Sequence, residues 1–204
     1  MLVALLGTLA LLVAGCGGSA DREAVSGLQE GGNHGYHGTY LDSPYVVPPM
    51  ALPDTAGKPY DLAAAPAPLK VVFFGYTNCP DICQVVMSTI ASAVNRLPAA
   101  QRSQVQVVFV TTDPDRDTGP VLRAYLDHLD PAFVGLTGPL PRIIDLAKPL
   151  KVYIEKGKRL PSGGYDVTHT TQVFALTGDR AQVAWSQDTS PAEMAADIIK
   201  LLKS

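Results

Sequence analysis

Two cysteines carry the most reactive chemistry in this sequence. Cys79 and Cys83 stand four residues apart in the segment YTNCPDIC, residues 76–83. If both lie in the first turns of a helix, their sulfurs project from one face, and the helix dipole lowers the pKa of a thiol at that end. Two such thiolates can bind a soft metal, Cu(I) or Zn, or cycle between dithiol and disulfide. An inert disulfide or a pair of buried structural thiols is the competing interpretation.

A third ligand could come from His169, in the segment YDVTHTT at residues 165–171. We expect it in a loop just before a strand whose sheet lies beside the cysteines. A neutral imidazole added to two sulfurs makes a ligand set that suits copper in either oxidation state. A solvated loop histidine is the alternative, because sequence spacing alone does not bring this residue to the thiols.

Two acidic residues are candidates for supporting the site. Asp81 lies between the cysteines and could tune their pKa, although an acid at a helix start also interacts with the helix dipole on its own account. Asp113 opens the charged segment DPDRD, residues 113–117, which follows an expected strand. The charged side chains of this segment, from Asp113 to Asp117, could form a rim for a partner or orient a metal-binding loop through hydrogen bonds, or the segment could be a solvated turn.

The segments on either side of Cys79 predict a strand and a helix that position it. Residues 69–75, LKVVFFG, form a nearly continuous apolar run, which is typical of a strand buried on both faces. Ile82 and the apolar residues that follow it at spacings of four, four, four and three predict an amphipathic helix that ends near Pro98. In open α/β folds, the loop after a central strand is where ligands bind.

The rest of the chain alternates strands and helices. We expect strands at 105–110 and 133–136, and helices at 121–129 and 141–148. The fold class is therefore α/β, with a central mixed sheet, helices on both of its faces, and a C-terminal antiparallel hairpin plus a helix that opens with the capping box SPAE. The closing strands are expected at 151–154, 171–176 and 182–185.

Length and composition bound the class of protein. The chain has 204 residues, 47% of them hydrophobic, which suits one domain plus a tail. Lys and Arg number 16 against 19 Asp and Glu, a formal net charge of −3 at pH 7. A chain without excess positive charge lacks the electrostatic footprint of a nucleic-acid-binding protein, so we expect no DNA or RNA partner. Three cysteines are too few for a disulfide scaffold and leave at least one unpaired.

The unpaired cysteine is expected to be Cys16, at the end of an apolar segment. Residues 1–15 contain no charged side chain, and their apolar run is too short to span a bilayer, so they are typical of a signal peptide. The sequence VAGC, which ends at Cys16, resembles the lipobox of bacterial lipoproteins, in which the cysteine is lipidated and becomes the first residue. No Lys or Arg stands near the start, which departs from the usual signal. An ordinary cleaved signal with an incidental cysteine is the alternative.

A lipid anchor would define the organisation of the mature chain. Residues 16–39 are rich in Gly and polar residues and have few large apolar ones, so we expect a lipidated, flexible tether there. Residues 40–204 form the expected folded domain. The protein is then exported and held at the outer face of the bacterial cytoplasmic membrane, where disulfides are allowed.

The segment VFFGYTNCPDIC, residues 72–83, resembles the copper-site signature of the Sco/SenC family, thioredoxin-fold copper proteins that help to assemble cytochrome c oxidase. Further matches follow in the family's order, and the resemblance covers about residues 39–204. Departures from the family pattern at Asn78, Gln84 and Thr177 remove no ligand. The further matches are DPDRDT at 113–118, KVY at 151–153 and YDVTH at 165–169.

The resemblance implies a thioredoxin-like fold and a copper site whose ligands are Cys79, Cys83 and His169. It also implies a membrane-tethered metallochaperone whose partner is the copper-bearing subunit of cytochrome c oxidase or another copper chaperone. Two other functions stay open. In a thiol-disulfide oxidoreductase, Cys79 would attack a partner's disulfide and Cys83 would resolve the intermediate. A thiol peroxidase is suggested by the general fold, but no recognisable motif places an activating Arg beside the cysteine.

Overall fold

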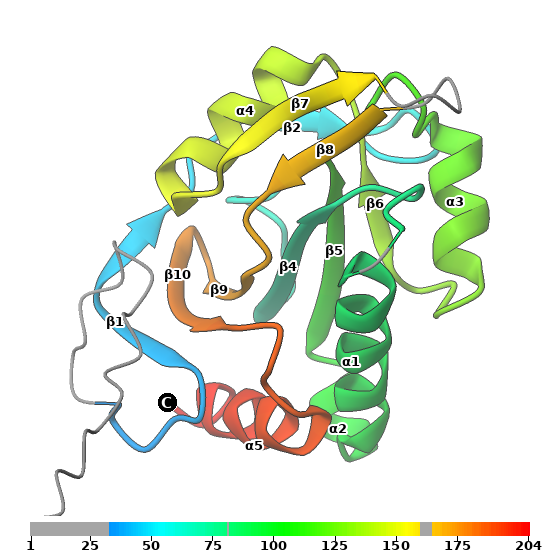
Figure 1. Ribbon diagram of the computed structural model, residues 1–204. Helices are drawn as coiled ribbons and strands as arrows, with labels where there is room; N and C mark the ends of the chain where they lie inside the picture. The colour runs from blue at the N-terminus through cyan, green and yellow to red at the C-terminus, as the bar shows by residue number, and fades with distance from the viewer. Residues whose placement is uncertain (1–32, 81, 160–164) are drawn as a thin grey trace, which may run out of the picture.

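A six-stranded mixed sheet forms the centre of the protein (Figure 1). The computed structural model describes residues 33–80, 82–159 and 165–204. The strand order is β1-β10-β9-β4-β5-β6, with β4, β5 and β6 parallel to one another and the other three antiparallel to their neighbours. This arrangement confirms the expected mixed α/β sheet. The strands are β1 (Thr39–Val46), β4 (Leu69–Gly75), β5 (Val105–Thr111), β6 (Val134–Leu136), β9 (Val173–Thr177) and β10 (Arg180–Trp185).

The central strand β4 is buried along its whole length, as its apolar run predicts. It pairs in parallel with β5, from Leu69 opposite Val105 to Gly75 opposite Thr111. Because strand residues alternate between faces, β4 divides the core into two layers. Phe73 belongs to one layer and Phe74 to the other. A strand with apolar residues on both faces must be covered from both sides.

Helices supply that cover. Buried residues of α1 (Ile82–Arg96), α3 (Gly119–Asp127) and α5 (Pro191–Leu201) belong to the Phe73 layer. Those of α4 (Leu140–Ala147) belong to the Phe74 layer. The expected capping box is confirmed in α5, where the Ser190 hydroxyl accepts the backbone N–H of Glu193 at 3.3 Å. No helix among the described residues is long and apolar enough to cross a membrane. The remaining elements are β2 (Ala51–Pro53), β3 (Pro59–Asp61), α2 (Ala99–Arg102) and the 3-10 turn η1 (Lys148–Leu150).

The strand expected at 151–154 is wrong. The 3-10 turn η1 carries a proline in its first turn, and Lys151 after it adopts a left-handed conformation, with φ 60°. The chain therefore becomes extended only at Ile154. From there, β7 (Ile154–Arg159) pairs with β8 (Tyr165–His169) in a separate antiparallel ladder. Of the three closing strands expected from the sequence, only β9 and β10 therefore belong to the central sheet.

The folded packing begins before residue 40. Tyr36 is buried in the Phe73 layer, and its ring lies 4.3 Å from the Lys200 Nζ atom. The Asp197 carboxylate of α5, itself buried, accepts the backbone N–H groups of His37 and Gly38 at 2.9 and 2.8 Å. It also accepts the indole N–H of Trp185 at 2.8 Å. Residues 33–38 are therefore part of the domain. Cys16 and the rest of residues 1–32 lie outside the described part.

Replacing Asp197 by Asn tests this anchor. The variant turns one acceptor oxygen into an N–H₂ group that faces donors, so we expect the free energy of unfolding to fall by about 1–3 kcal/mol in urea titration. The control is Asp145→Asn, which alters an exposed carboxylate on α4. Equal stability of the two variants would contradict the anchoring role of Asp197.

Candidate functional site

The two cysteines meet where β4 passes into α1. Both are free thiols; Cys83 is fully buried, and Cys79 is 9% exposed. The backbone N–H of Cys79 donates to the Tyr76 carbonyl at 3.2 Å, which closes a turn after the strand. The N–H of Cys83 then donates to the Cys79 sulfur at 3.5 Å, and the two thiols hydrogen-bond to each other. The site therefore offers two adjacent sulfurs, and only Cys79 keeps a small exposed fraction.

The expectation that both cysteines lie in the helix is wrong. The helix α1 begins at Ile82, so only Cys83 belongs to it. The first N–H groups of a helix have no partner inside the helix. The Cys79 sulfur accepts one of them, from Cys83, and this contact rather than helical spacing brings the two residues together.

Burial governs the ionisation of the inner thiol. Removal from water raises the pKa of Cys83 well above its ordinary value, and the hydrogen bond with Cys79 raises it further. The hydrogen bond with the Tyr76 backbone acts in the opposite direction but is smaller. The lowered pKa expected at the helix N-terminus is therefore wrong for Cys83. A metal that binds this sulfur must displace a proton.

Gly75 leaves the space that the Cys83 sulfur occupies. A Cβ atom at this last residue of β4 would lie 3.2 Å from Cys83 Sγ and 2.8 Å from the ring of Phe73. Any side chain here would push the thiol or the ring aside. The last residue of the strand and the thiol are therefore packed as one unit.

The last carboxylate of the charged segment at residues 113–117 holds the cysteine loop, one of the roles expected for that segment. Asp117 is fully buried and accepts the Thr77 N–H at 2.9 Å and the hydroxyls of Thr77 and Thr111 at 2.6 Å each. Burial raises the pKa of Asp117, although the three donors oppose this shift. Its backbone carbonyl accepts the Thr137 hydroxyl at 3.2 Å. Asp117 thus ties the loop before Cys79 to the ends of β5 and β6.

Asp113 lies beside this carboxylate and acts on a different group. It is buried and forms an ion pair with Arg116. The Arg116 guanidinium carbon lies 5.7 Å from the centre of the Tyr76 ring. Asp113 therefore reaches the cysteine loop through Arg116 and Tyr76. Asp81, the other acidic candidate, lies outside the described residues.

Tyr76 also connects the cysteine loop to β8. Its hydroxyl accepts the backbone N–H of Val167 at 3.4 Å, and Val167 is buried in the same apolar cluster as both cysteines. His169 follows two residues later, as the last residue of β8, where its backbone pairs with Ile154. The loop placement expected for His169 is therefore wrong. Figure 1 shows the β7–β8 ladder across the top of the molecule, above β4 and β5.

The side chain of His169 lies outside the described part, so the structure gives only the backbone of this residue, at the end of β8. Among the side chains that are described, no three His, Cys, Asp or Glu residues gather closely enough to hold a metal. The described part of the site is a pair of sulfurs enclosed by Gly75, Tyr76 and the Asp117 loop.

Solved structures resemble this chain over most of its length. Apo Sco1 of Thermus thermophilus matches with a TM-score of 0.74 at 32% identity, covering 84% of this chain and 99% of that one. ScoI of Bradyrhizobium japonicum, solved with copper bound, matches with a TM-score of 0.69 at 28% identity, covering 76% and 99%. These likenesses confirm the expected thioredoxin-like α/β fold.

Sequence relatives lead to the same group of proteins. The SCO2-like protein RC0895 of Rickettsia conorii is 33% identical over 157 residues, 76% of each chain. The mitochondrial protein SCO2 of Saccharomyces cerevisiae is 30% identical over 129 residues, 63% of this chain and 43% of that one. This chain thus spans about half the length of the mitochondrial relatives it matches. The SCO1/SenC family matches residues 39–203, and the chain belongs to that family.

Proposed function

We propose that this protein is a membrane-tethered copper metallochaperone. It binds copper through the thiolates of Cys79 and Cys83 and the imidazole of His169. It delivers the metal to the copper-bearing subunit of cytochrome c oxidase, or to another copper chaperone, or it prepares the copper site of that subunit. The observation that carries the proposal is the pair of adjacent free thiols at the end of β4. Sco relatives solved with copper bound, at 28% and 25% identity, support the choice of metal.

The chemistry of the thiols supports copper. Soft thiolate ligands select Cu(I), and an added imidazole also accommodates Cu(II). Cys83 is protonated in the metal-free protein because burial raises its pKa, so loading releases a proton. The partly exposed Cys79 is the sulfur that an incoming donor or acceptor meets first.

The position of β8 supports His169 as the third ligand. The strand belongs to a two-stranded ladder outside the main sheet. Its backbone is held to the cysteine loop by the hydrogen bond between Val167 and Tyr76. A ligand on such a ladder can leave the metal without disturbing the central sheet. Transfer then proceeds by ligand exchange in which His169 releases the copper before the sulfurs do.

Anaerobic Cu(I) and Cu(II) titrations of the reduced domain test this ligand set. We expect one copper per wild-type chain and none in Cys83→Ser, which keeps a single thiolate. In His169→Ala the affinity should fall more than the roughly tenfold that loss of an outer partner costs. His128→Ala, an exposed histidine at the C-terminal end of α3, is the matched control. Unchanged copper binding in His169→Ala would remove His169 from the ligand set.

The hydrogen bond between the thiols favours a second candidate function, thiol-disulfide exchange. The Cys79 thiolate would attack one sulfur of a partner's disulfide, breaking that bond and releasing one partner thiolate. The Cys83 thiolate would then attack the Cys79 sulfur and release the second. The partner gains two electrons and takes up the two thiol protons. This chain loses the two electrons and the two protons and is left with a Cys79–Cys83 disulfide.

Single-turnover reduction of a peptide disulfide by the reduced domain distinguishes this function from copper binding. We expect Cys79→Ser to abolish turnover, because the accessible nucleophile is gone. Cys83→Ser should accumulate the mixed disulfide, and His169→Ala should retain the wild-type rate. Mass spectrometry of quenched reactions measures each species. Turnover that persists without Cys79 would count against the oxidoreductase.

The membrane tether rests on Cys16 and is tested separately. We expect the mature protein from the bacterial membrane fraction to start at Cys16 and to carry a lipid there, with residues 1–15 removed. Intact-mass and peptide mass spectrometry measure both changes. Cys16→Ala is the control and should be found unlipidated. An unmodified cysteine in the exported wild-type protein would end the lipoprotein assignment.

A further inference from the structure

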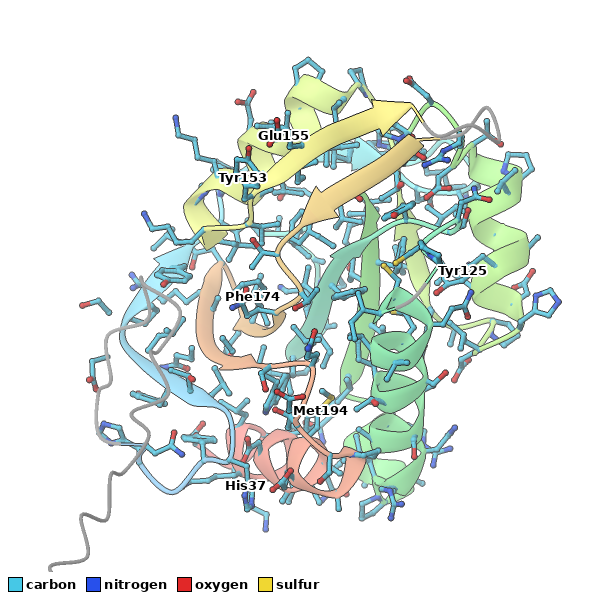
Figure 2. The ribbon with its side chains drawn as sticks, viewed as in Figure 1. His37, Tyr125, Tyr153, Glu155, Phe174 and Met194 are labelled. Atoms are coloured by element: carbon cyan, nitrogen blue, oxygen red, sulfur yellow. The ribbon has the colours of Figure 1, made fainter. Side chains whose placement is uncertain are left out.

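Tyr125 of α3 has a buried hydroxyl that the proposed chemistry does not use. Its ring packs against Phe109 of β5, with ring centres 5.5 Å apart, and contacts the same apolar cluster as both cysteines. The hydroxyl oxygen has no hydrogen-bond partner within the part of the chain that the structure describes. In Figure 2, Tyr125 lies between α3 and the loop that leads into α1.

A buried, unpaired hydroxyl costs free energy, so its presence needs a reason. The Phe109 ring against which Tyr125 packs lies on the same side of the core as the inner thiol, because a Cβ atom at Gly75 would lie 3.2 Å from both Phe109 and Cys83 Sγ. Burial is the main cause that raises the pKa of Tyr125, with smaller contributions in the same direction from Cys83, Cys79 and Asp117, so the phenol remains a neutral O–H donor. The hydroxyl is therefore a neutral donor in the core layer that holds both thiols.

The nearby acceptors are occupied or weak in the metal-free protein. The Asp117 carboxylate already accepts three hydrogen bonds, from Thr77 and Thr111. The two thiols hydrogen-bond to each other, and neutral sulfur is a weak acceptor. A sulfur that carries negative charge as a metal ligand is a much better one, because hydrogen bonds to charged groups are roughly twice as strong.

We propose that the Tyr125 hydroxyl is a positioning donor that forms a hydrogen bond to the Cys83 sulfur when this sulfur binds copper. The inference rests on the proposed copper site and deepens it. In the metal-free protein this hydrogen bond is absent, and the unpaired hydroxyl lowers the stability of the fold. In the loaded protein the bond withdraws electron density from the thiolate, which favours Cu(I) over Cu(II), since hydrogen bonding at a cysteine sulfur tunes a copper site.

The variant Tyr125→Phe removes only the oxygen and keeps the packing on Phe109. We expect the metal-free variant to be at least as stable as wild type in urea titration, because an unpaired group is lost. Its Cu(I) affinity, measured by competition with a chromophoric chelator, should fall about tenfold. The reduction potential of the loaded site should fall as well. The control is Tyr60→Phe, a partly buried tyrosine that packs on the opposite layer of the core.

Three results separate the inference from the copper proposal. A wild-type chain that binds no copper would overturn both. Wild-type binding with an unchanged affinity and potential in Tyr125→Phe would overturn only the role of Tyr125. A metal-free variant that loses stability, with no further loss on loading, would assign the hydroxyl a structural bond and also overturn the inference.

Discussion

The buried carboxylate of Asp117 is the constraint on which the site depends. An ionised group away from water is costly unless hydrogen bonds satisfy it, and here three donors converge on its two oxygens. Two of the donors belong to Thr77, in the loop that leads to Cys79. The third is the hydroxyl of Thr111, at the end of β5. Because these groups satisfy one another only in this arrangement, the carboxylate fixes how the cysteine loop leaves the sheet.

The site combines a rigid part with a more independent one. The sulfur of Cys83 is enclosed by the core and fits against the bare backbone of Gly75, so it cannot move far without disturbing β4. The ladder that ends at His169 lies outside the main sheet. A long hydrogen bond from the Val167 N–H to the Tyr76 hydroxyl connects this ladder to the cysteine loop. Binding and release of a ligand are easier when only the β7–β8 ladder has to move and the cysteine side of the site stays in place.

The sequence predicted the local elements well, because each rests on a short-range pattern. The apolar run of β4, the four-residue spacing of α1 and the capping box at Ser190 are examples. Contacts between residues far apart in the sequence were harder to predict. Asp113 and Asp117 look equivalent in a charged loop, and only the folded chain shows which carboxylate meets Thr77. The thiols illustrate the same limit, since helical spacing implied two helical residues where the structure has one. The roles of the three proposed ligands stay predictions.

The hydrogen bonds of Asp197 affect how the domain responds to a mechanical force applied at its N-terminal end. Any tension along the chain before residue 33 enters the fold through residues 33–38, where Tyr36 is buried and Asp197 accepts the N–H groups of His37 and Gly38, and then passes along β1. The hydrogen bonds between β1 and β10 and those of the Asp197 carboxylate resist this force. The hydrogen bonds between the two strands are then loaded along the strand direction. The sheet order places two strands, β10 and β9, between β1 and the cysteine-bearing β4. A pull on the N-terminal end of the domain would therefore act on β1 and α5 before it reached β4.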